Sequence, residues 1–197
     1  MNDVSKLKYL FGENYHEWSY EKDYLRLVSP DQVIKFVLNE ADNHYNMADF
    51  HIWDMFGGIG TDAIRLASGC RKVTCSEIDG TTYDHLKKNI EQQDVNNVTP
   101  IFSDCVAMLK TLPDDVDLIY FDPPWGTSFE SGKKFSFENI TLPNGTNIMD
   151  LVKKCAATKK HLIIKSPENC LSFELAFDEQ IKRILSFPKP KLKFIFI

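Results

Sequence analysis

The sequence lacks a membrane-spanning segment and the pattern of a disulfide-stapled protein. Its longest apolar runs, such as Phe194 to Ile197, are far shorter than the roughly 18 residues that a membrane-spanning helix needs. The five cysteines are an odd number and no two have the CxxC spacing, so we expect free thiols in a reducing compartment. The chain does not open on a basic stretch followed by an apolar one, and we therefore expect an intracellular protein with no membrane partner.

Metal-binding patterns are missing as well. The five histidines are scattered and show neither HExxH nor CxxC…HxxxH spacing, so we expect no metal site. What is present is an ordinary globular composition of 197 residues, 43% of them hydrophobic and 12% aromatic. This composition excludes global disorder and suits one packed domain, or one domain with a short arm.

Charge is distributed unevenly along the chain. Residues 1–130 carry 11 Lys and Arg against 22 Asp and Glu, whereas residues 131–197 carry 12 against 6. A basic end on an acidic protein can bind nucleic acid. From charge alone, however, a solvated lysine surface is the better interpretation.

Strand and helix patterns alternate after an N-terminal arm over residues 1–28. Ser29 and Pro30 mark a helix start, with Ser29 as the expected N-cap, and Val33, Ile34 and Val37 lie on one face of that helix. The expected strands cover residues 50–55, 72–77, 98–102, 116–121, 161–165, 181–187 and 192–197. The expected helices that follow cover residues 61–68, 81–93, 104–111 and 147–157.

This alternation predicts an α/β fold for the domain over residues 29–197. It is a Rossmann-like, mostly parallel sheet with helices on both faces. The turn between the last two strands is too short for a crossover helix, so we expect an antiparallel C-terminal strand pair. Ligands of such sheets bind at the carboxyl ends of the strands.

Residues at two of these strand ends suit an adenosine-containing ligand. The first strand runs into Asp54 and a loop with Gly57, Gly58 and Gly60, where the backbone can approach a ligand closely. An acid at this place repels a pyrophosphate but attracts the amino group of S-adenosylmethionine. Glu77 ends the next strand and can accept both ribose hydroxyls. The alternative for the loop is a tight turn with a capping Asp54.

Further residues extend this candidate site. Asp104 follows the third strand and can accept from the adenine amino group, although a helix N-cap explains it equally well. Asp79 is better explained as the cap of the next helix.

The most specific pattern is Asp122-Pro123-Pro124-Trp125 after the fourth strand. The two prolines fix the backbone so that a carbonyl and the carboxylate of Asp122 can accept from an exocyclic amine. The indole of Trp125 offers a flat face on which a base can stack, and a cationic base adds a cation–π attraction. Alone, the stretch is equally well explained as a proline-rich turn with a core tryptophan.

Together, these motifs resemble those of class I S-adenosylmethionine-dependent methyltransferases, and among them the trimethylguanosine synthases. Residues 27–34 resemble their S-V-T-P-E-x-I segment, residues 54–67 their D-A-F-C-G-V-G-G-N-T-I-Q-F-A, and residues 123–126 their S-P-P-W-G-G. Residues 143–145 and 167–169 stand where that family has P-D-G and P-R-N. The resemblance covers roughly residues 20–197.

The resemblance implies transfer of a methyl group from S-adenosylmethionine to the N2 amine of a 7-methylguanosine RNA cap. It implies that Asp122, Pro123 and Trp125 carry the reaction and that Trp125, Lys165 and Asn169 bind the substrate. The donor site it implies comprises Ser29, Asp54, Gly57, Gly58, Gly60, Glu77, Ile78, Asp104 and Asp122. Capped RNA is the implied partner, and a monomer is compatible with the sequence.

Two other functions remain open. The family has Ser at the position of Asp122, whereas adenine-N6 methyltransferases have Asp, and this favours adenine, or another exocyclic amine of a nucleobase, in DNA or RNA as the acceptor. A methyltransferase fold that only binds RNA or supports a partner is the non-enzymatic alternative. Glu168 replaces the arginine with which the family contacts the cap phosphates, so Lys165 or the pair Lys133 and Lys134 would have to make that contact.

Overall fold

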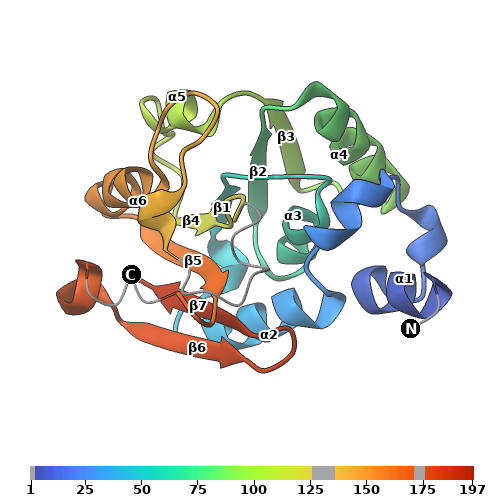
Figure 1. Cartoon of the computed structure of the whole chain (residues 1–197), viewed down its shortest axis with the longest axis horizontal. Coiled ribbons are helices and arrows are strands. Elements are labelled where there is room, and N and C mark those ends of the chain that lie inside the picture. The colour runs from blue at the N-terminus through green and yellow to red at the C-terminus, as the bar shows by residue number, and fades with distance from the viewer. Residues whose placement is uncertain (1–2, 126–135, 171–175) are drawn as a thin grey trace. The chain divides into compact units, whose positions relative to one another are not determined.

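The computed structural model describes residues 3–125, 136–170 and 176–197. The chain forms two compact units, Met1–Cys105 and Val106–Ile197, which run from blue to green and from green to red in Figure 1. The arm expected over residues 1–28 belongs to the first unit. No helix among the described residues is both long and apolar enough to span a membrane. The same residues contain no cluster of His, Cys, Asp and Glu that could hold a metal ion.

The first unit contains three parallel strands in the order β3-β2-β1. Its elements are α1 (Asp3–Phe11), η1 (Tyr15–Glu17), η2 (Lys22–Arg26), α2 (Asp31–Asp42), η3 (Met47–Asp49), β1 (His51–Asp54), α3 (Thr61–Leu66), η4 (Ala67–Gly69), β2 (Lys72–Glu77), α4 (Gly80–Gln92) and β3 (Val98–Phe102). All four residues of β1 are buried, as expected for a strand within a parallel sheet. The carboxyl ends of β2 and β3 are aligned, because Glu77 lies opposite Phe102.

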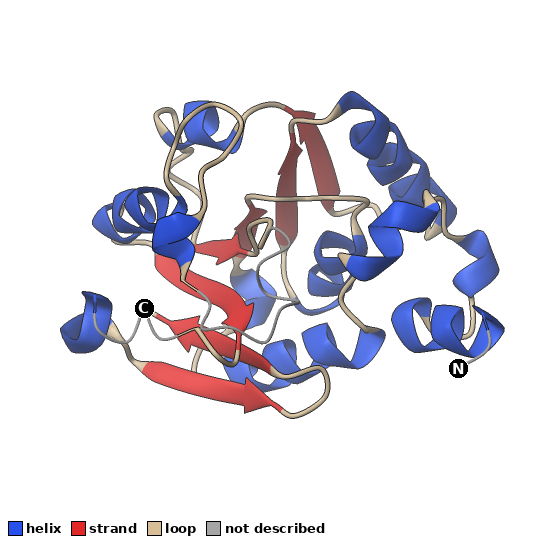
Figure 2. Ribbon diagram, viewed as in Figure 1, coloured by secondary structure: helices blue, strands red, loops and turns tan. Residues whose placement is uncertain are grey.

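The second unit contains four strands in the order β4-β5-β7-β6. Its elements are β4 (Leu118–Phe121), η6 (Phe137–Asn139), α6 (Ile148–Ala157), β5 (His161–Pro167), η7 (Asp178–Gln180), β6 (Arg183–Phe187) and β7 (Leu192–Phe196), with α5 (Cys105–Leu109) at the boundary of the two units. Strands β4 and β5 are parallel, whereas β7 is antiparallel to both β5 and β6. Figure 2 shows helices packed alongside the strands of each unit.

The fold class expected from the sequence is therefore confirmed. The elements are those of a Rossmann-like α/β protein with mostly parallel strands and an antiparallel C-terminal pair. The expected bounds of the strands and helices differ from the observed ones by no more than two residues. Val33, Ile34 and Val37 are fully buried, as the apolar face of α2 predicts.

The helix start at α2 is correct, but the expected role of Ser29 as its N-cap is wrong. Pro30 occupies the N-cap position, and no side chain caps the helix. The hydroxyl of Ser29 instead donates to Asp62 of α3 over 2.9 Å, and both residues are buried. This contact joins the start of α2 to the start of α3.

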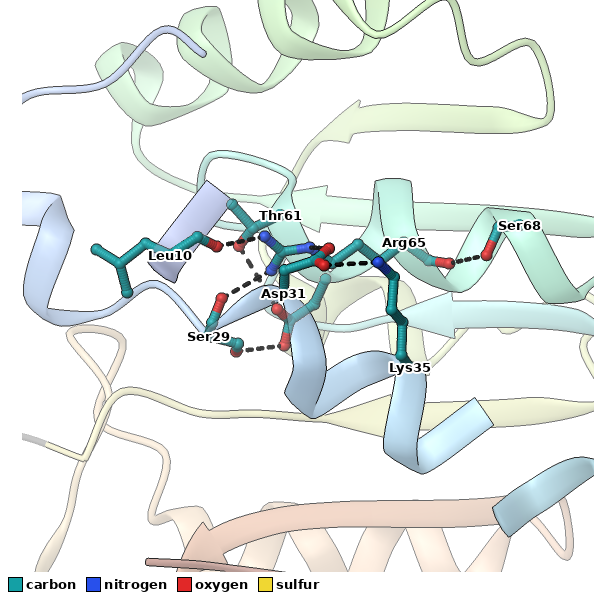
Figure 3. Close-up of polar contacts among 8 residues, drawn as sticks. Leu10, Ser29, Asp31, Lys35, Thr61, Arg65 and Ser68 are labelled. Atoms are coloured by element: carbon teal, nitrogen blue, oxygen red, sulfur yellow. Dashed lines mark hydrogen bonds and ion pairs between the residues drawn. The ribbon is translucent and has the colours of Figure 1, made fainter. Parts of the chain in front are cut away.

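The guanidinium of Arg65 is the centre of this junction (Figure 3). It donates to the carbonyl oxygens of Leu10 at 2.5 Å and Ser29 at 2.7 Å, and its Nε lies 3.3 Å from a carboxylate oxygen of Asp31. Arg65 is only 8% exposed and also lies over the ring of Trp18. One buried side chain thus connects α3 to the arm and to α2.

Replacing Arg65 with methionine should lower the free energy of unfolding by about 3 kcal/mol, because two carbonyl groups and a carboxylate lose their buried donor. Urea unfolding followed by circular dichroism measures the loss. The matched control is Arg71→Met, since Arg71 is exposed and donates to the carbonyl oxygen of Asp49. Equal effects of the two substitutions would contradict the central role of Arg65.

Candidate active site

The loop between β1 and α3 contains the glycines that the sequence singled out. Gly60 has a φ of +92°, and a Cβ atom there would lie 2.7 Å from the side chain of Leu86, so any other residue would be strained and would displace Leu86. Gly58 also has a positive φ, of +53°, but a Cβ there would meet nothing within 4 Å. The loop is therefore packed tightly at Gly60 and open at Gly58, where a ligand can approach the backbone.

Glu77 binds this loop from the end of β2. One of its carboxylate oxygens accepts from the N–H of Gly58 at 2.9 Å, and the other accepts from Ile78 and Asp79, both at 2.8 Å. Burial raises the pKa of Glu77, while the three N–H donors act in the opposite direction. Asp54, which ends β1, is 1% exposed. The first unit thus holds two carboxylates at neighbouring strand ends.

Two exposed apolar side chains lie beside these acids. Ile78 is 52% exposed and Phe102, at the end of β3, is 59% exposed. The ring of Phe102 lies 5.3 Å from that of Tyr83, and Asp104 follows two residues later. Exposed apolar surface next to an acid at a strand end suits a flat base. Phe102 was not singled out from the sequence, although the register that pairs it with Glu77 could have indicated it.

Asp79 has a structural role at the start of α4. Its side chain caps α4 by accepting from the N–H of Thr82 at 2.8 Å, as expected. The hydrogen bonds to Thr82 lower the pKa of Asp79.

The turn after β4 brings together Asp122, Trp125 and Lys165 within the second unit. The ammonium of Lys165 lies 2.5 Å from a carboxylate oxygen of Asp122 and 5.7 Å from the centre of the Trp125 ring. The side chain of Lys165 is 4% exposed and that of Asp122 is 18% exposed. Trp125 is half-buried rather than enclosed in the core, and Pro123 is buried. An ion pair with no net charge and a partly accessible indole therefore form one cluster.

This geometry changes the role expected for Lys165. Because its ammonium is buried against Asp122, we assign Lys165 to that carboxylate and not to a phosphate group. Asn169 and Glu168 follow β5 and are exposed, and the Glu168 carboxylate lies 4.0 Å from the ammonium of Lys191. The pair Lys133 and Lys134 lies outside the described residues.

Comparison with known structures shows the same fold in proteins of low sequence identity. The precorrin-6y C5,15-methyltransferase of Geobacter metallireducens is 15% identical, with a TM-score of 0.61, over 92% of this chain and 93% of its own. A Pyrococcus horikoshii protein named as a candidate RNA methyltransferase is 15% identical, with a TM-score of 0.60, over 85% of this chain and 83% of its own. The precorrin 8W decarboxylase of Methanobacterium thermoautotrophicum is 14% identical, with a TM-score of 0.57, over 92% of this chain and 96% of its own. At this level of identity the likeness shows the fold and not the substrate.

The fold and the glycine loop with its two strand-end acids fit a methyltransferase, and a match to a methyltransferase family shows that the chain is one, with S-adenosylmethionine as the implied donor. The sequence pattern of one methyltransferase family, the RNA cap guanine-N2 methyltransferases, matches residues 50–194. The chain belongs to that family. No curated protein matches the chain.

The residues of the first unit fit S-adenosylmethionine. The open backbone at Gly58 and the buried carboxylate of Asp54 suit its amino acid part, and Glu77 suits the ribose. Ile78 and Phe102 supply exposed apolar surface for the adenine. When bound, the donor supplies a methyl group already activated by the positive sulfonium, so the protein has to bind and orient the reactants.

Replacing Glu77 with glutamine should weaken binding of S-adenosylhomocysteine roughly 10- to 100-fold, because charge-assisted hydrogen bonds are worth about 1.5–3 kcal/mol. In the wild type the affinity should fall on acidification, starting above pH 4.5, the ordinary pKa of a glutamate, since the pKa of Glu77 is raised. This component of the pH dependence should vanish in the variant. Isothermal titration calorimetry between pH 5 and 8 measures both effects. Glu91→Gln, at an exposed acid of α4, is the control and should bind like the wild type.

Proposed function

We propose that this protein transfers a methyl group from S-adenosylmethionine to the exocyclic N2 amine of a 7-methylguanosine cap on RNA. The observation that carries the proposal is the Asp122–Lys165–Trp125 cluster at the end of β4, in a chain of the cap guanine-N2 methyltransferase family. The cluster combines a carboxylate, which can accept from an amine, with a half-buried indole, on which a base can stack.

Trp125 stacks on the base in this proposal. The N7-methylated guanine is cationic, and an indole face attracts a cation. Because the ammonium of Lys165 already lies 5.7 Å from the ring centre, a second cation on the same face would be repelled. The methylated base therefore stacks on the face of Trp125 opposite Lys165.

Asp122 orients the amine by accepting one of its N–H groups. Lys165 keeps the carboxylate in place, since the two are joined at 2.5 Å. Fixing the direction of the amine lone pair lowers the activation barrier through orientation alone. Ideal alignment of two reactants can lower a barrier by about 7–11 kcal/mol, and this contact supplies a part of that. The amine loses a proton after transfer, and the 18% exposure of Asp122 gives water access to accept it.

A panel of capped dinucleotides tests the proposal. The protein is incubated with labelled S-adenosylmethionine and m7GpppA, m7GpppG or the unmethylated GpppG. Labelling of the two m7G-containing compounds alone is the expected result. Labelling of none of the three, while oligonucleotides that contain adenine are methylated, would instead support adenine-N6 transfer, the function that the carboxylate of Asp122 favours.

Replacing Glu168 with arginine should tighten binding of m7GpppA about three- to tenfold, because an exposed acid is exchanged for a phosphate-binding cation beside Lys191. Fluorescence titration measures the dissociation constant. The control ligand is 7-methylguanosine, which has no phosphates and should bind the variant and the wild type equally. An unchanged affinity for m7GpppA would show that the phosphate bridge does not pass residue 168.

A further inference from the structure

The side chain of Asn89 connects the N-terminal arm with the glycine loop. Asn89 lies in α4 and is fully buried. Its amide nitrogen donates to the carbonyl oxygen of Ser19 in the arm at 2.9 Å and to that of Ile59 in the glycine loop at 2.8 Å. Its amide oxygen accepts from the N–H of Ser19 at 2.6 Å. One side chain thus satisfies three backbone groups that belong to the arm and to the loop.

Apolar packing joins the same two segments. Ile59 of the glycine loop lies in one buried cluster with Leu10, Phe11 and Trp18 of the arm. The ring of Phe11 stacks on those of Trp18 and Tyr20, with both pairs of ring centres 5.2 Å apart. The arm therefore packs against the apolar side of the loop.

The arm has two further attachments close to the donor residues. The hydroxyls of Tyr24 and Thr82 are 2.5 Å apart, at the first turn of α4, shortly after Glu77. At the other end of the glycine loop, Arg65 of α3 donates to the carbonyl oxygen of Leu10, as Figure 3 shows. The loop and the helices that flank it are thus tied to the arm on both sides.

We propose that Asn89 is a positioning residue that couples docking of the arm to the conformation of the glycine loop. Binding of the methyl donor and docking of the arm then strengthen each other, because a coupling between two events acts equally in both directions. This inference rests on the glycine loop binding the donor.

His85 and Ser19 provide matched controls. The hydroxyl of Ser19 hydrogen-bonds to Nδ1 of His85 at 2.8 Å, so His85→Ala and Ser19→Ala each remove one side-chain contact between the arm and α4 while the Asn89 bonds keep the arm docked. Neither substitution touches the bonds of Asn89, which are made to the main chain of Ser19 and Ile59. Asn89→Asp keeps the acceptor for the N–H of Ser19 and removes the donor to the carbonyl oxygens of both Ser19 and Ile59.

Isothermal titration calorimetry with S-adenosylhomocysteine tests the coupling on the full chain. Asn89→Ala and Asn89→Asp should raise the dissociation constant roughly tenfold or more, the equivalent of losing about one buried hydrogen bond. Ser19→Ala and His85→Ala should change the dissociation constant by less than about twofold, because the Asn89 bonds remain. We expect this even if their melting temperatures fall as much as those of the Asn89 variants. Equal dissociation constants for the Asn89 variants and the wild type would overturn the proposal.

Hydrogen exchange of the wild type gives a test that does not depend on a variant folding. Saturation with S-adenosylhomocysteine should slow amide exchange in residues 15–25 of the arm as well as in the glycine loop. Protection confined to the loop and to Glu77 would overturn the coupling, and a wild type that does not bind S-adenosylhomocysteine would overturn it too. If the wild type binds this ligand but leaves capped dinucleotides unmethylated, the proposed substrate fails and the coupling stands.

Discussion

Replacing Trp125 with alanine should lower kcat/KM for m7GpppA about 100-fold, while the affinity for S-adenosylhomocysteine stays within about twofold of the wild type. A stacked base is worth about 1–3 kcal/mol on an aromatic side chain, and a cationic base adds a cation–π attraction of about 0.5–2 kcal/mol. Trp125 is half-buried, so its removal should cost little stability compared with removal of a core aromatic.

Two controls separate stacking from folding. Trp125→Phe retains a flat face and should recover part of the activity, with a smaller attraction for the cation. Trp18→Phe changes a second tryptophan that lies against a cation, Arg65, and keeps an aromatic ring in the arm. It should leave kcat/KM for m7GpppA near its original value. Steady-state kinetics and calorimetry give the two quantities. An unchanged kcat/KM in Trp125→Ala would remove the indole from the substrate site.

The second large effect concerns the Asp122–Lys165 pair. Lys165→Met should lower the free energy of unfolding by about 3 kcal/mol, because it leaves a carboxylate that is 18% exposed without its buried counter-charge. Asp122→Asn in the same background should restore most of this loss, since the remaining side chain is neutral. Urea unfolding of the wild type, the two single variants and the double variant completes a double-mutant cycle.

Activity should respond differently from stability in this cycle. The double variant is expected to fold well yet to methylate m7GpppA poorly, because its amide offers a weaker acceptor than the carboxylate to the amine. Lys154→Met, at an exposed lysine of α6, is the control for loss of a positive charge. A coupling energy near zero between positions 122 and 165 would contradict the ion pair as the organising contact of this turn.

Much of the fold was predictable because the signals are local. Apolar runs separated by glycine, proline and acidic residues define the strands and helices, and the short turn between β6 and β7 forces an antiparallel pair. The connection of Gly58 with Glu77 follows the same logic, since both residues stand at the carboxyl ends of adjacent parallel strands.

The polar contacts of the arm were not predictable in the same way. Arg65 and Asn89 donate to main-chain oxygens of Leu10, Ser19 and Ile59. Every residue has a main-chain carbonyl, so the sequence does not indicate which of them accepts such a bond. The N-cap expected at Ser29 failed for a related reason, because a tertiary partner, Asp62, takes the hydroxyl that a local rule assigns to the helix.

Lys165 lies between these cases. Its pairing with Asp122 spans 43 positions, and the family resemblance suggested a phosphate-binding lysine instead. The register of β4 and β5 places Phe121 opposite Ile164, which brings the residues that follow, Asp122 and Lys165, side by side. The pairing could therefore have been derived once the strand order was known, and a buried lysine is expected to seek such a partner.

The position of the transferred methyl group tests the central claim most directly. The compound m7GpppA carries both candidate acceptors, the N2 amine of the methylated guanine and the N6 amine of the adenine. After reaction with labelled S-adenosylmethionine, the dinucleotide is cleaved to nucleosides and separated by liquid chromatography with mass spectrometry. We predict that all label resides in N2,7-dimethylguanosine or its N2-dimethylated form, whereas label in N6-methyladenosine would contradict the account.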